Sequence, residues 1–347
     1  MAGVTSGRLW EWASAALVLV LVVPAANGRI ALTAGVAGVE PLDPDFAWVV
    51  SIRADGDDPR VLAGPKARAP AFRSDGHMIA FTRFRDIRVG GELRERSLGV
   101  YLMRADGTAK RRLIACRCSA PAWAPFGRRL AFHRAGTPPR IFVFRRGRVR
   151  VLVRGYGPAW SPDGRWIAFS RNDRPQPEGF SLASIYLMRP DGSRVRRLAL
   201  GAQPDWTPDG RRIVFRGERR RNAILSIRPN GRGLRRVAVF RSRDPQNAVP
   251  AWPTSAPNGR LIAFIKGFSD DPDWIWLMRA DGSGHRRIFN PDRWARSGGL
   301  PERLIGFSSV FPLSLDWQPR RLVTRMLTTS TGKATADGLD SLLPRRR

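Results

Sequence analysis

The feature that most constrains this chain is a short unit that recurs along most of its length. The clearest copy reads WSPDG from Trp160, IAF from Ile167 and IYLM from Ile185. Self-similarity of this kind is the sequence signature of a repeat fold. One anchoring aromatic marks each copy, at Phe72, Trp123, Trp160, Trp206, Trp252 and Trp317.

Each copy predicts four β-strands. Short apolar or alternating runs are bounded by Pro, Asp and Gly, and no helical periodicity exceeds one turn. Pro-Asp-Gly joins the first two strands and Asp-Gly the last two, and these residues tolerate the positive φ of primed hairpin turns. The turn Asp stands at Asp75, Asp163 and Asp209. Phe126 and Asn258 replace it elsewhere, so we expect those two turns to differ locally.

The two ends of the repeat region carry complementary fragments of one unit. Residues 30–62 supply a second, third and fourth strand, and residues 315–319 supply a first strand alone. Radial closure of four-stranded units protects strand edges in propellers. We therefore expect an all-β, six-bladed β-propeller of four-stranded antiparallel blades, one blade being closed by strands from both termini. An open solenoid is the alternative, but it leaves the complementary ends unexplained. Insertions at 85–99, 172–184 and 266–273 fall between second and third strands, on one face.

This unit resembles the WD40-like repeat called PD40, found in TolB-type periplasmic proteins and in the propellers of prolyl-oligopeptidase-type peptidases. The resemblance covers about residues 27–320. It implies a six-bladed propeller, export, and contact with other proteins. The sequence shows neither the α/β domain that precedes the TolB propeller nor a hydrolase domain, so neither Tol–Pal transport nor peptidase activity is expected.

The N-terminus predicts export. Residues 1–26 read as a signal peptide, with Arg8 before the apolar run 12–23 and small residues after it. That run is shorter than the roughly 20 residues of a membrane-spanning helix, and a retained N-terminal anchor is the alternative. We expect a propeller over 27–326 and a flexible basic tail over 327–347. The protein is expected to be a periplasmic, cell-envelope or secreted monomer that meets a membrane only through an uncleaved signal segment.

The charge of the chain favours acidic partners. Its 60 Lys and Arg against 29 Asp and Glu give a formal net charge of +31, which promotes salt-sensitive association with polyanions. Arg pairs recur near the fourth strands, where they either protect exposed edges or form a basic girdle for anionic polymers. No nucleic-acid recognition motif is present, so no nucleic acid is expected. The pairs are Arg111-Arg112, Arg196-Arg197, Arg235-Arg236 and Arg286-Arg287.

No catalytic residue, metal site or cofactor is predicted. The string nearest to a nucleophile elbow, 179–183, lacks the second Gly. A phosphate loop and EF-hand spacing are absent, and the acidic stretch 270–273 reads as a solvated loop. His77, His133 and His285 belong to different copies and read as solvated or packing residues.

The residues preceding the anchoring aromatics are the candidates for a site. A Trp repeated in every copy predicts packing between blades, so the blade-forming set is Phe72, Asp75, Trp123, Trp160, Asp163, Trp206, Asp209, Trp252 and Trp317. The preceding residue in each copy is expected to face the channel: Ala71, Ala122, Ala159, Asp205, Ala251 and Asp316. Asp205 and Asp316 therefore predict a ligand or cation site at the channel mouth. Cys116 and Cys118 form either a disulfide, if exported, or a pair of ordinary thiols.

Together these features predict an exported, non-enzymatic β-propeller that acts as a scaffold for a protein or an anionic cell-envelope polymer. The alternative is a polysaccharide lyase or hydrolase with its site at the channel mouth. Such an enzyme would need His, Arg and carboxylates clustered there, and the scattered histidines count against it.

Overall fold

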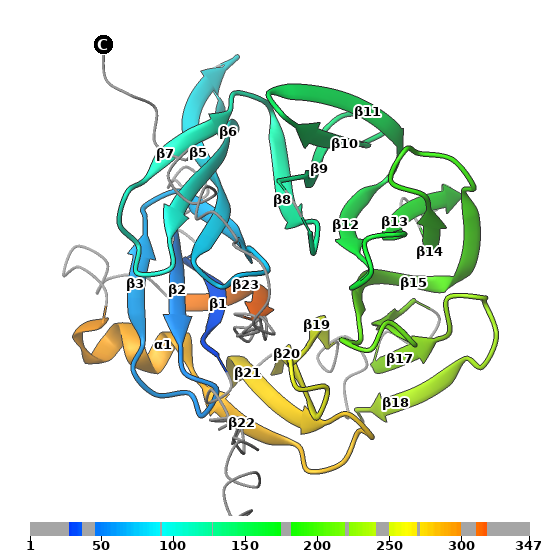
Figure 1. The fold of residues 1–347 in the computed structure, drawn as a ribbon. Coiled ribbons are helices and arrows are strands. Elements are labelled where there is room, and N and C mark those ends of the chain that lie inside the picture. The colour runs from blue at the N-terminus through cyan, green and yellow to red at the C-terminus, as the bar shows by residue number, and fades with distance from the viewer. Residues whose placement is uncertain are drawn as a thin grey trace, which may run out of the picture.

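The strands of this chain form antiparallel sheets that stand around a central axis like propeller blades (Figure 1). The computed structural model describes residues 28–36, 46–90, 92–126, 128–174, 182–218, 222–240, 250–268, 271–299 and 310–317. In each sheet the first strand lies beside the axis and the last lies at the rim (Figure 1). The fold is therefore an all-β propeller.

Four of the described sheets contain four strands each. The terminal sheet has the order β23 (Val310–Trp317), β1 (Ile30–Val36), β2 (Phe46–Ile52), β3 (Arg60–Ala63). The next comprises β4 (Ala67–Phe72), β5 (Met78–Val89), β6 (Glu92–Arg104), β7 (Arg111–Ile114). The third comprises β8 (Cys118–Trp123), β9 (Leu130–Arg134), β10 (Arg140–Arg145), β11 (Arg148–Arg154). The fourth comprises β19 (Ala251–Ser255), β20 (Leu261–Phe268), β21 (Asp271–Arg279), β22 (Arg286–Phe289).

The remaining sheet has seven strands, because the long strand β15 pairs with β14 through its first half and with β16 through its second half. β15 pairs with β14 through residues 196–200 and with β16 through residues 201–206. Its members are β12 (Tyr156–Trp160), β13 (Ile167–Arg174), β14 (Leu182–Met188), β15 (Arg196–Trp206), β16 (Ile213–Gly217), β17 (Ala223–Ile227), β18 (Arg235–Val239).

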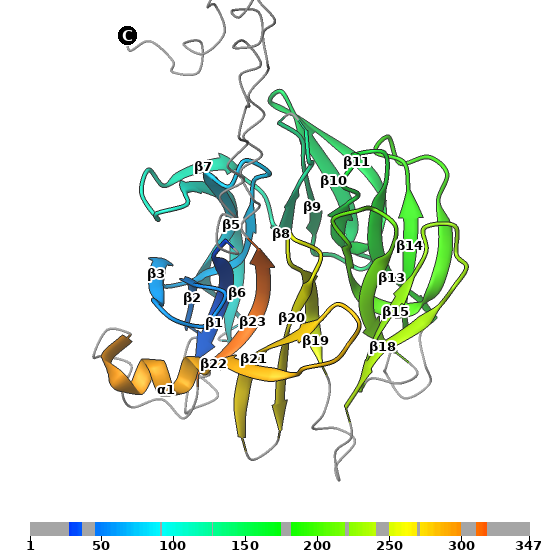
Figure 2. The same cartoon turned by 60° about the horizontal axis from the view of Figure 1, so that its bottom comes forward.

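The terminal sheet joins the two ends of the repeat region. Asp316 on β23 lies opposite Ala31 on β1, and Trp317 lies opposite Ile30. A short helical stretch, α1 (Pro291–Trp294) and η1 (Ala295–Gly299), precedes β23 and lies beside β22 (Figure 2). Within the described residues, no helix has the length and apolar character needed to cross a bilayer.

The core lies between neighbouring sheets, as the repeated aromatics require. Trp160 packs with Ile141 of the preceding sheet and Phe169 of its own. Its indole N–H donates to the carbonyl of Ala122 at 3.1 Å, and that of Trp206 donates to the carbonyl of Ala159 at 3.1 Å. The Phe of each Ile-Ala-Phe segment, or of its variants Leu-Ala-Phe and Ile-Val-Phe, is fully buried, at Phe81, Phe132, Phe169, Phe215 and Phe264.

The hairpin turns differ from the primed turns that we expected. In the WSPDG turn only Gly164 has a positive φ (66°), and its N–H donates to the carbonyl of Ser161 at 2.8 Å. This is a type I turn followed by a left-handed Gly. Asp163 instead accepts the N–H of Arg165 at 3.0 Å, which an Asx side chain does well. Asn258 accepts the N–H of Arg260 in the same way (2.8 Å), so the expected difference at that turn is wrong.

At two places the turn between the third and fourth strands of a sheet packs closely against the last strand of the preceding sheet. Gly282 has φ 91°, and a Cβ there would lie 1.7 Å from the carbonyl oxygen of Val237 on β18. At Gly56 a Cβ would lie 1.8 Å from the carbonyl oxygen of Ile288 on β22. No residue with a side chain fits between turn and strand at these two places.

The insertion at 85–99 forms a hairpin rather than a loop. β5 and β6 stay paired as far as Val89 and Glu92, and the hairpin projects beyond its sheet (Figure 1). Lys66 Nζ lies 2.9 Å from Asp86, and Arg68 lies 2.7 Å from Glu95, so ion pairs tie this extension to β4. The insertions at 172–184 and 266–273 lie partly outside the described residues. Residues 1–26, the tail 327–347 and residues 179–181 lie wholly outside them.

The register of β19 corrects our alignment of the sixth copy. Thr254 lies opposite Ala263 and Ser255 opposite Ile262, as Ala159 lies opposite Ala168 and Trp160 opposite Ile167. Ser255, not Trp252, therefore stands at the anchoring position, three residues before Asn258, as Trp160 stands three residues before Asp163. The Pro-Ala-Trp string at 250–252 misled the alignment, because pairing with β20 decides which residue reaches the core.

Trp252 occupies a bulge that recurs in the first strand of each unit. The bulged residue is left-handed in five copies, at Ala69 (φ 53°), Ala120 (φ 48°), Gly157 (φ 56°), Gln203 (φ 58°) and Trp252 (φ 52°). The register shifts on either side of this residue. A left-handed conformation costs an L-residue roughly 1–2 kcal/mol, and a bulge turns its side chain away from the regular alternation.

Candidate functional site: the central channel

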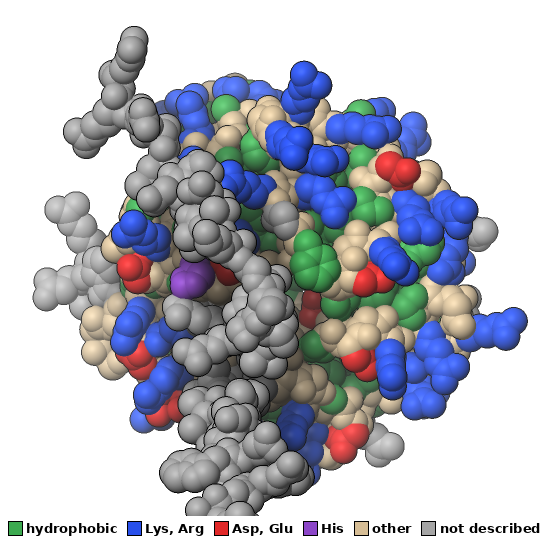
Figure 3. Space-filling model, in the orientation of Figure 1, with side chains coloured by type: hydrophobic (Ala, Val, Ile, Leu, Met, Phe, Trp, Pro, Cys, Tyr) green, Lys and Arg blue, Asp and Glu red, His purple; other side chains and the backbone are tan. Residues whose placement is uncertain are grey.

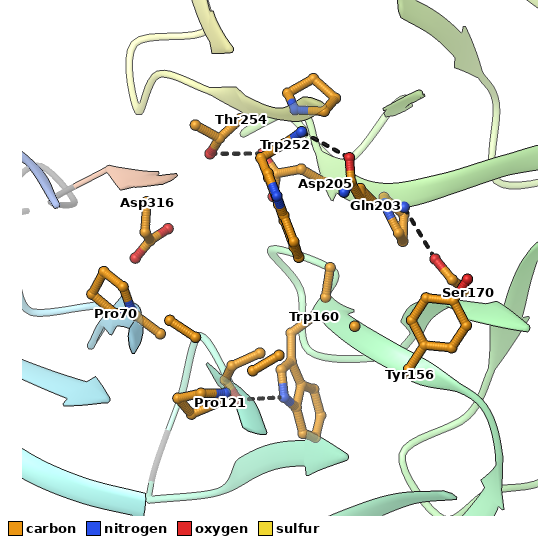
Figure 4. Close-up of a pocket in the computed structure, with 18 of the residues that line it drawn as sticks. Pro70, Pro121, Tyr156, Trp160, Ser170, Gln203, Asp205, Trp252, Thr254 and Asp316 are labelled. Atoms are coloured by element: carbon orange, nitrogen blue, oxygen red, sulfur yellow. Dashed lines mark hydrogen bonds between the residues drawn. The ribbon is translucent and has the colours of Figure 1, made fainter. Parts of the chain in front are cut away.

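The first strands of the sheets enclose a cavity of about 440 Å³ on the propeller axis (Figure 4). Its wall comes from β4, β8, β12, β15, β19 and β23. The wall is asymmetric. β4 and β8 contribute chiefly Ala and Pro before their aromatics, whereas the other strands of the wall carry larger or polar groups, namely Tyr156, Gln203, Asp205, Arg216, Trp252, Thr254 and Asp316.

Trp252 is the aromatic that the bulge brings to this cavity. Figure 4 shows its indole pointing into the cavity from β19, toward Trp160. Its backbone N–H donates to Oε1 of Gln203 at 2.8 Å, and its ring also packs against the cluster between β20 and the terminal sheet. The repeated Trp pattern hid this residue, since Trp252 looked like one more packing aromatic.

The Gln203 amide accepts the N–H of Trp252 because the neighbouring side chain, that of Arg216, cannot accept a hydrogen bond. At two other bulges a hydroxyl on the second strand of the preceding unit accepts the N–H of the bulged residue: Thr33 accepts that of Ala69 at 2.9 Å, and Ser170 that of Gln203 at 3.0 Å. The matching position before Trp252 holds Arg216, opposite Ala202. Arginine has no acceptor, so the Gln203 amide takes over.

The side chain of Arg216 forms an ion pair with Glu218, two residues further along the chain. Its guanidinium lies 2.6 Å from Glu218, whose side chain is 4% exposed. Its Nε is buried without a hydrogen-bond partner among the described residues. Tyr156 stands nearby, and burial, together with the charge of Glu218, raises the pKa of its hydroxyl.

Asp205 lines the cavity as predicted, and its carboxylate also ties two sheets together. One oxygen accepts the backbone N–H of Ser255 at 2.8 Å and lies 3.3 Å from the hydroxyl of Thr254, both on β19. Burial raises the pKa of Asp205 from 3.8 to about 6, against these hydrogen bonds, which lower it.

Asp316 repeats this arrangement at the junction of the chain ends. Its carboxylate accepts the backbone N–H of Phe72 on β4 at 2.5 Å. Ser255 and Phe72 are equivalent residues, because each lies at the anchoring position of the following first strand. Both predicted Asp residues therefore line the cavity and also accept a hydrogen bond from the next sheet.

Of the other predicted channel residues, Ala71, Ala122 and Ala159 line the cavity. Ala251 does not, and Thr254 takes its place because of the shifted register. Within the residues that the structure describes, no group of three or more His, Cys, Asp or Glu is arranged to hold a metal ion.

The predicted histidine and cysteine positions lie away from the cavity lining. His133 is largely buried, and burial lowers its pKa from 6.5 to about 4. His77 and His285 are exposed, and the His285 ring lies 5.2 Å from that of Phe240. The sulfurs of Cys116 and Cys118 are bonded to each other in the structure.

These features define a β-propeller with a lined central channel. The sequence profile of the family described as the TolB beta propeller domain (PD40) matches residues 53–298. The chain therefore belongs to the TolB β-propeller family.

Solved structures of low sequence identity share the fold. TolB from Acinetobacter baumannii has 16% identity and a TM-score of 0.61, over 85% of this chain and 67% of that one. A candidate TolB from Agrobacterium tumefaciens has 20% identity and a TM-score of 0.53, over 76% and 89%. Hydrazine synthase from Kuenenia stuttgartiensis has 12% identity and a TM-score of 0.55, over 76% and 45%. No curated protein sequence matches significantly. At these identities the likeness concerns the fold alone.

Proposed function

We propose that this chain is an exported, non-enzymatic scaffold that binds a partner protein at its central channel. The observation that carries the proposal is the cavity of about 440 Å³ whose lining departs from the repeat at Trp252, Asp205 and Asp316. Residues that only build blades would be expected to repeat. These residues differ from most of their counterparts, and they come from three successive first strands, β15, β19 and β23.

The chemistry of the lining suits recognition better than catalysis. An aromatic ring beside carboxylates attracts a cationic side chain of a partner, since cation–π and ionic contacts act together. Each carboxylate also accepts a hydrogen bond from a neighbouring sheet. The described lining contains no histidine, so a lyase or hydrolase at this place is the weaker proposal. Ligand or cation binding by Asp205 and Asp316 is part of the proposal.

We infer that the propeller has six blades. Counting β15 as two strands, residues 196–200 and 201–206, divides the seven-stranded sheet into two four-stranded blades. The change of partner at residue 201 supports this count. We further propose a monomer, with the segment 1–26 as its export signal and the recurring Arg pairs as a secondary, salt-sensitive contact for anionic envelope polymers.

The proposal is tested by pull-down of the tagged mature protein from envelope extract at low and high salt. A partner that survives high salt with the parent protein and is lost with Trp252→Ala supports a channel site. The matched control is Leu234→Ala, which removes an exposed apolar side chain (57% exposed) outside the cavity lining. Equal capture by all three proteins would contradict the channel site, and turnover of polyuronates or peptides would contradict the non-enzymatic assignment.

A further inference from the structure

The rim strand β11 differs from the rim strands of the other four-stranded sheets. It has seven residues, whereas β3, β7 and β22 have four each. Those three strands are exposed over their first two residues and then turn inward, but the first four residues of β11, Arg148 to Val151, are all exposed. β11 is also the edge of its sheet, with β10 on its inner side.

The exposed part of β11 alternates Arg and Val. Arg148 and Arg150 face one side of the sheet, and Val149 and Val151, which are 47% and 46% exposed, face the other. The backbone stays regular here, since Arg150 pairs with Val143 and Val149 with Phe144. An antiparallel edge of this kind presents its outward N–H and C=O groups to an added strand. Further along, Gly192 of the next turn lies against Leu152, and the fully exposed part of β11 ends at Val151.

The surroundings of this edge carry mainly positive charge; the exception is Asp191 in the neighbouring turn, whose pKa is lowered mainly by hydrogen bonds with Ser193 and to a smaller extent by the charge of Arg150. Every charged side chain between Asp106 and Asp163 is Lys or Arg, and this segment contains the whole β8–β11 sheet. Lys and Arg side chains gather where Figure 1 places β10 and β11 (Figure 3). Among the described residues, no carboxylate lies at ion-pair distance from Arg145, Arg146, Arg148 or Arg150. The hairpin tip at Arg146 and Gly147 adds to the charge.

These charges decide which strand fits. Arginines on an edge repel a second copy of the same edge, because like charges then face each other across the strands. An acidic segment is attracted to this edge instead of being repelled. Its carboxylates lie beside Arg148 and Arg150, while its alternate apolar side chains meet Val149 and Val151.

We propose that β11 is a second interaction site, which takes an extended acidic segment of a partner protein as an added antiparallel strand. The backbone supplies the hydrogen bonds, and the arginines select the sequence. This site lies at the rim and is independent of the channel, so neither proposal depends on the other.

The test measures binding of a fluorescent octapeptide of alternating Glu and Val by anisotropy, with the full mature chain, at several salt concentrations. We expect the affinity to fall at least tenfold in the double variant Arg148→Glu/Arg150→Glu. The matched control, Arg165→Glu/Arg211→Glu, makes the same charge change at two exposed turn positions, with side chains 75% and 85% exposed, and should change affinity less than twofold. Equal losses in both double variants would show general attraction to a basic surface and overturn the proposal.

A second arm separates strand addition from charge without altering the protein. The same peptide N-methylated at alternate residues keeps its charge and loses its hydrogen-bonding edge, and we expect at least tenfold weaker binding. Hydrogen exchange at residues 148–151 should slow with the parent peptide. Equal binding of both peptides, or equal competition by a polyuronate without protection of these amides, would mean that the edge attracts polyanions only, and the proposal would be wrong.

Discussion

The carboxylate of Asp205 accepts the backbone N–H of Ser255 at 2.8 Å and so joins β15 to β19. The acid that makes this link is buried enough to raise its pKa to about 6. The hydrogen bond between β15 and β19 is thus accepted by a carboxylate whose ionised form is destabilised by burial.

This cost predicts how the variant Asp205→Asn depends on pH. The pKa is about 6 in the folded protein and 3.8 as the ordinary value, so the folded state binds the proton more tightly between them. The stability contribution of Asp205 therefore falls as pH rises from 4 to 6. Asn keeps an acceptor for Ser255 but has no charge. Its advantage over the parent should grow from near zero at pH 4 to at most about 3 kcal/mol above pH 6, measured by urea unfolding. An advantage that does not change with pH would contradict this.

His133 predicts the opposite slope. Burial lowers its pKa from 6.5 to about 4, so the unfolded chain binds the proton more tightly between these values. Stability is fully present above pH 6.5 and falls as pH drops toward 4, by up to about 3 kcal/mol. His133→Gln should lose this acid-dependent part, as seen in the difference between the two unfolding curves. NMR titration checks the cause, because the His133 ring signals should stay constant down to about pH 5.

Asp316 predicts the strength of the junction between the chain ends. Asp316→Ala leaves the N–H of Phe72 without its acceptor, which costs about 1–3 kcal/mol. Asp316→Asn retains an acceptor and should lose less. Thermal and urea unfolding measure both variants, and equal stability of Asp316→Ala and the parent would show that this contact contributes nothing.

Trp252 and Trp206 should respond differently to truncation. Trp206 is 5% exposed and lies in a buried cluster with residues of β13, β14, β16 and β17, so Trp206→Ala should cost about 3–5 kcal/mol. Trp252 lines the cavity and has φ 52°. Its truncation should cost less than half as much, and Trp252→Gly less again because Gly relieves the backbone. Equal costs would restore Trp252 to the blade-forming set.

Cys116 and Cys118 provide a test of export chemistry. Mature protein isolated from the envelope should resist alkylation until a reductant is added, which intact-mass measurement detects. Immediate alkylation of both residues would identify ordinary thiols. The double variant Cys116→Ser/Cys118→Ser should fold, because a disulfide that closes so short a loop restricts the unfolded chain little.

The sequence predicted the strands and the turn residues well where the copies agree. Ile-Ala-Phe segments and Asp-Gly pairs specify a buried strand and a turn by local chemistry alone, so Phe169 and Gly164 lie where expected. The sheet shared by both ends followed from the same pattern.

Prediction failed where a longer-range contact decides the outcome. Pairing with β20 placed Ser255 rather than Trp252 at the anchoring position. The spacing of Ser255 from Asn258-Gly259 matches that of Trp160 from Asp163-Gly164, but the stronger Pro-Ala-Trp pattern pointed to Trp252. The hairpin at 85–99 depends on ion pairs from Lys66 and Arg68 that lie far away in sequence. The role of Asp205 was half visible: its place in the channel followed from alternation, but the hydrogen bond to Ser255 depends on the neighbouring sheet.

The glycine contact between successive sheets has a consequence for building new rings from these units. Gly282 lies against Val237, and Gly56 lies against Ile288, with no room for a side chain. At these two places, the turn of one four-stranded module (one sheet with its turns) therefore makes the contact with the module before it. A unit transplanted between relatives, or duplicated within one chain, should assemble in order if that glycine and the backbone of the receiving strand are kept. Surface residues elsewhere on the module are then free to diversify.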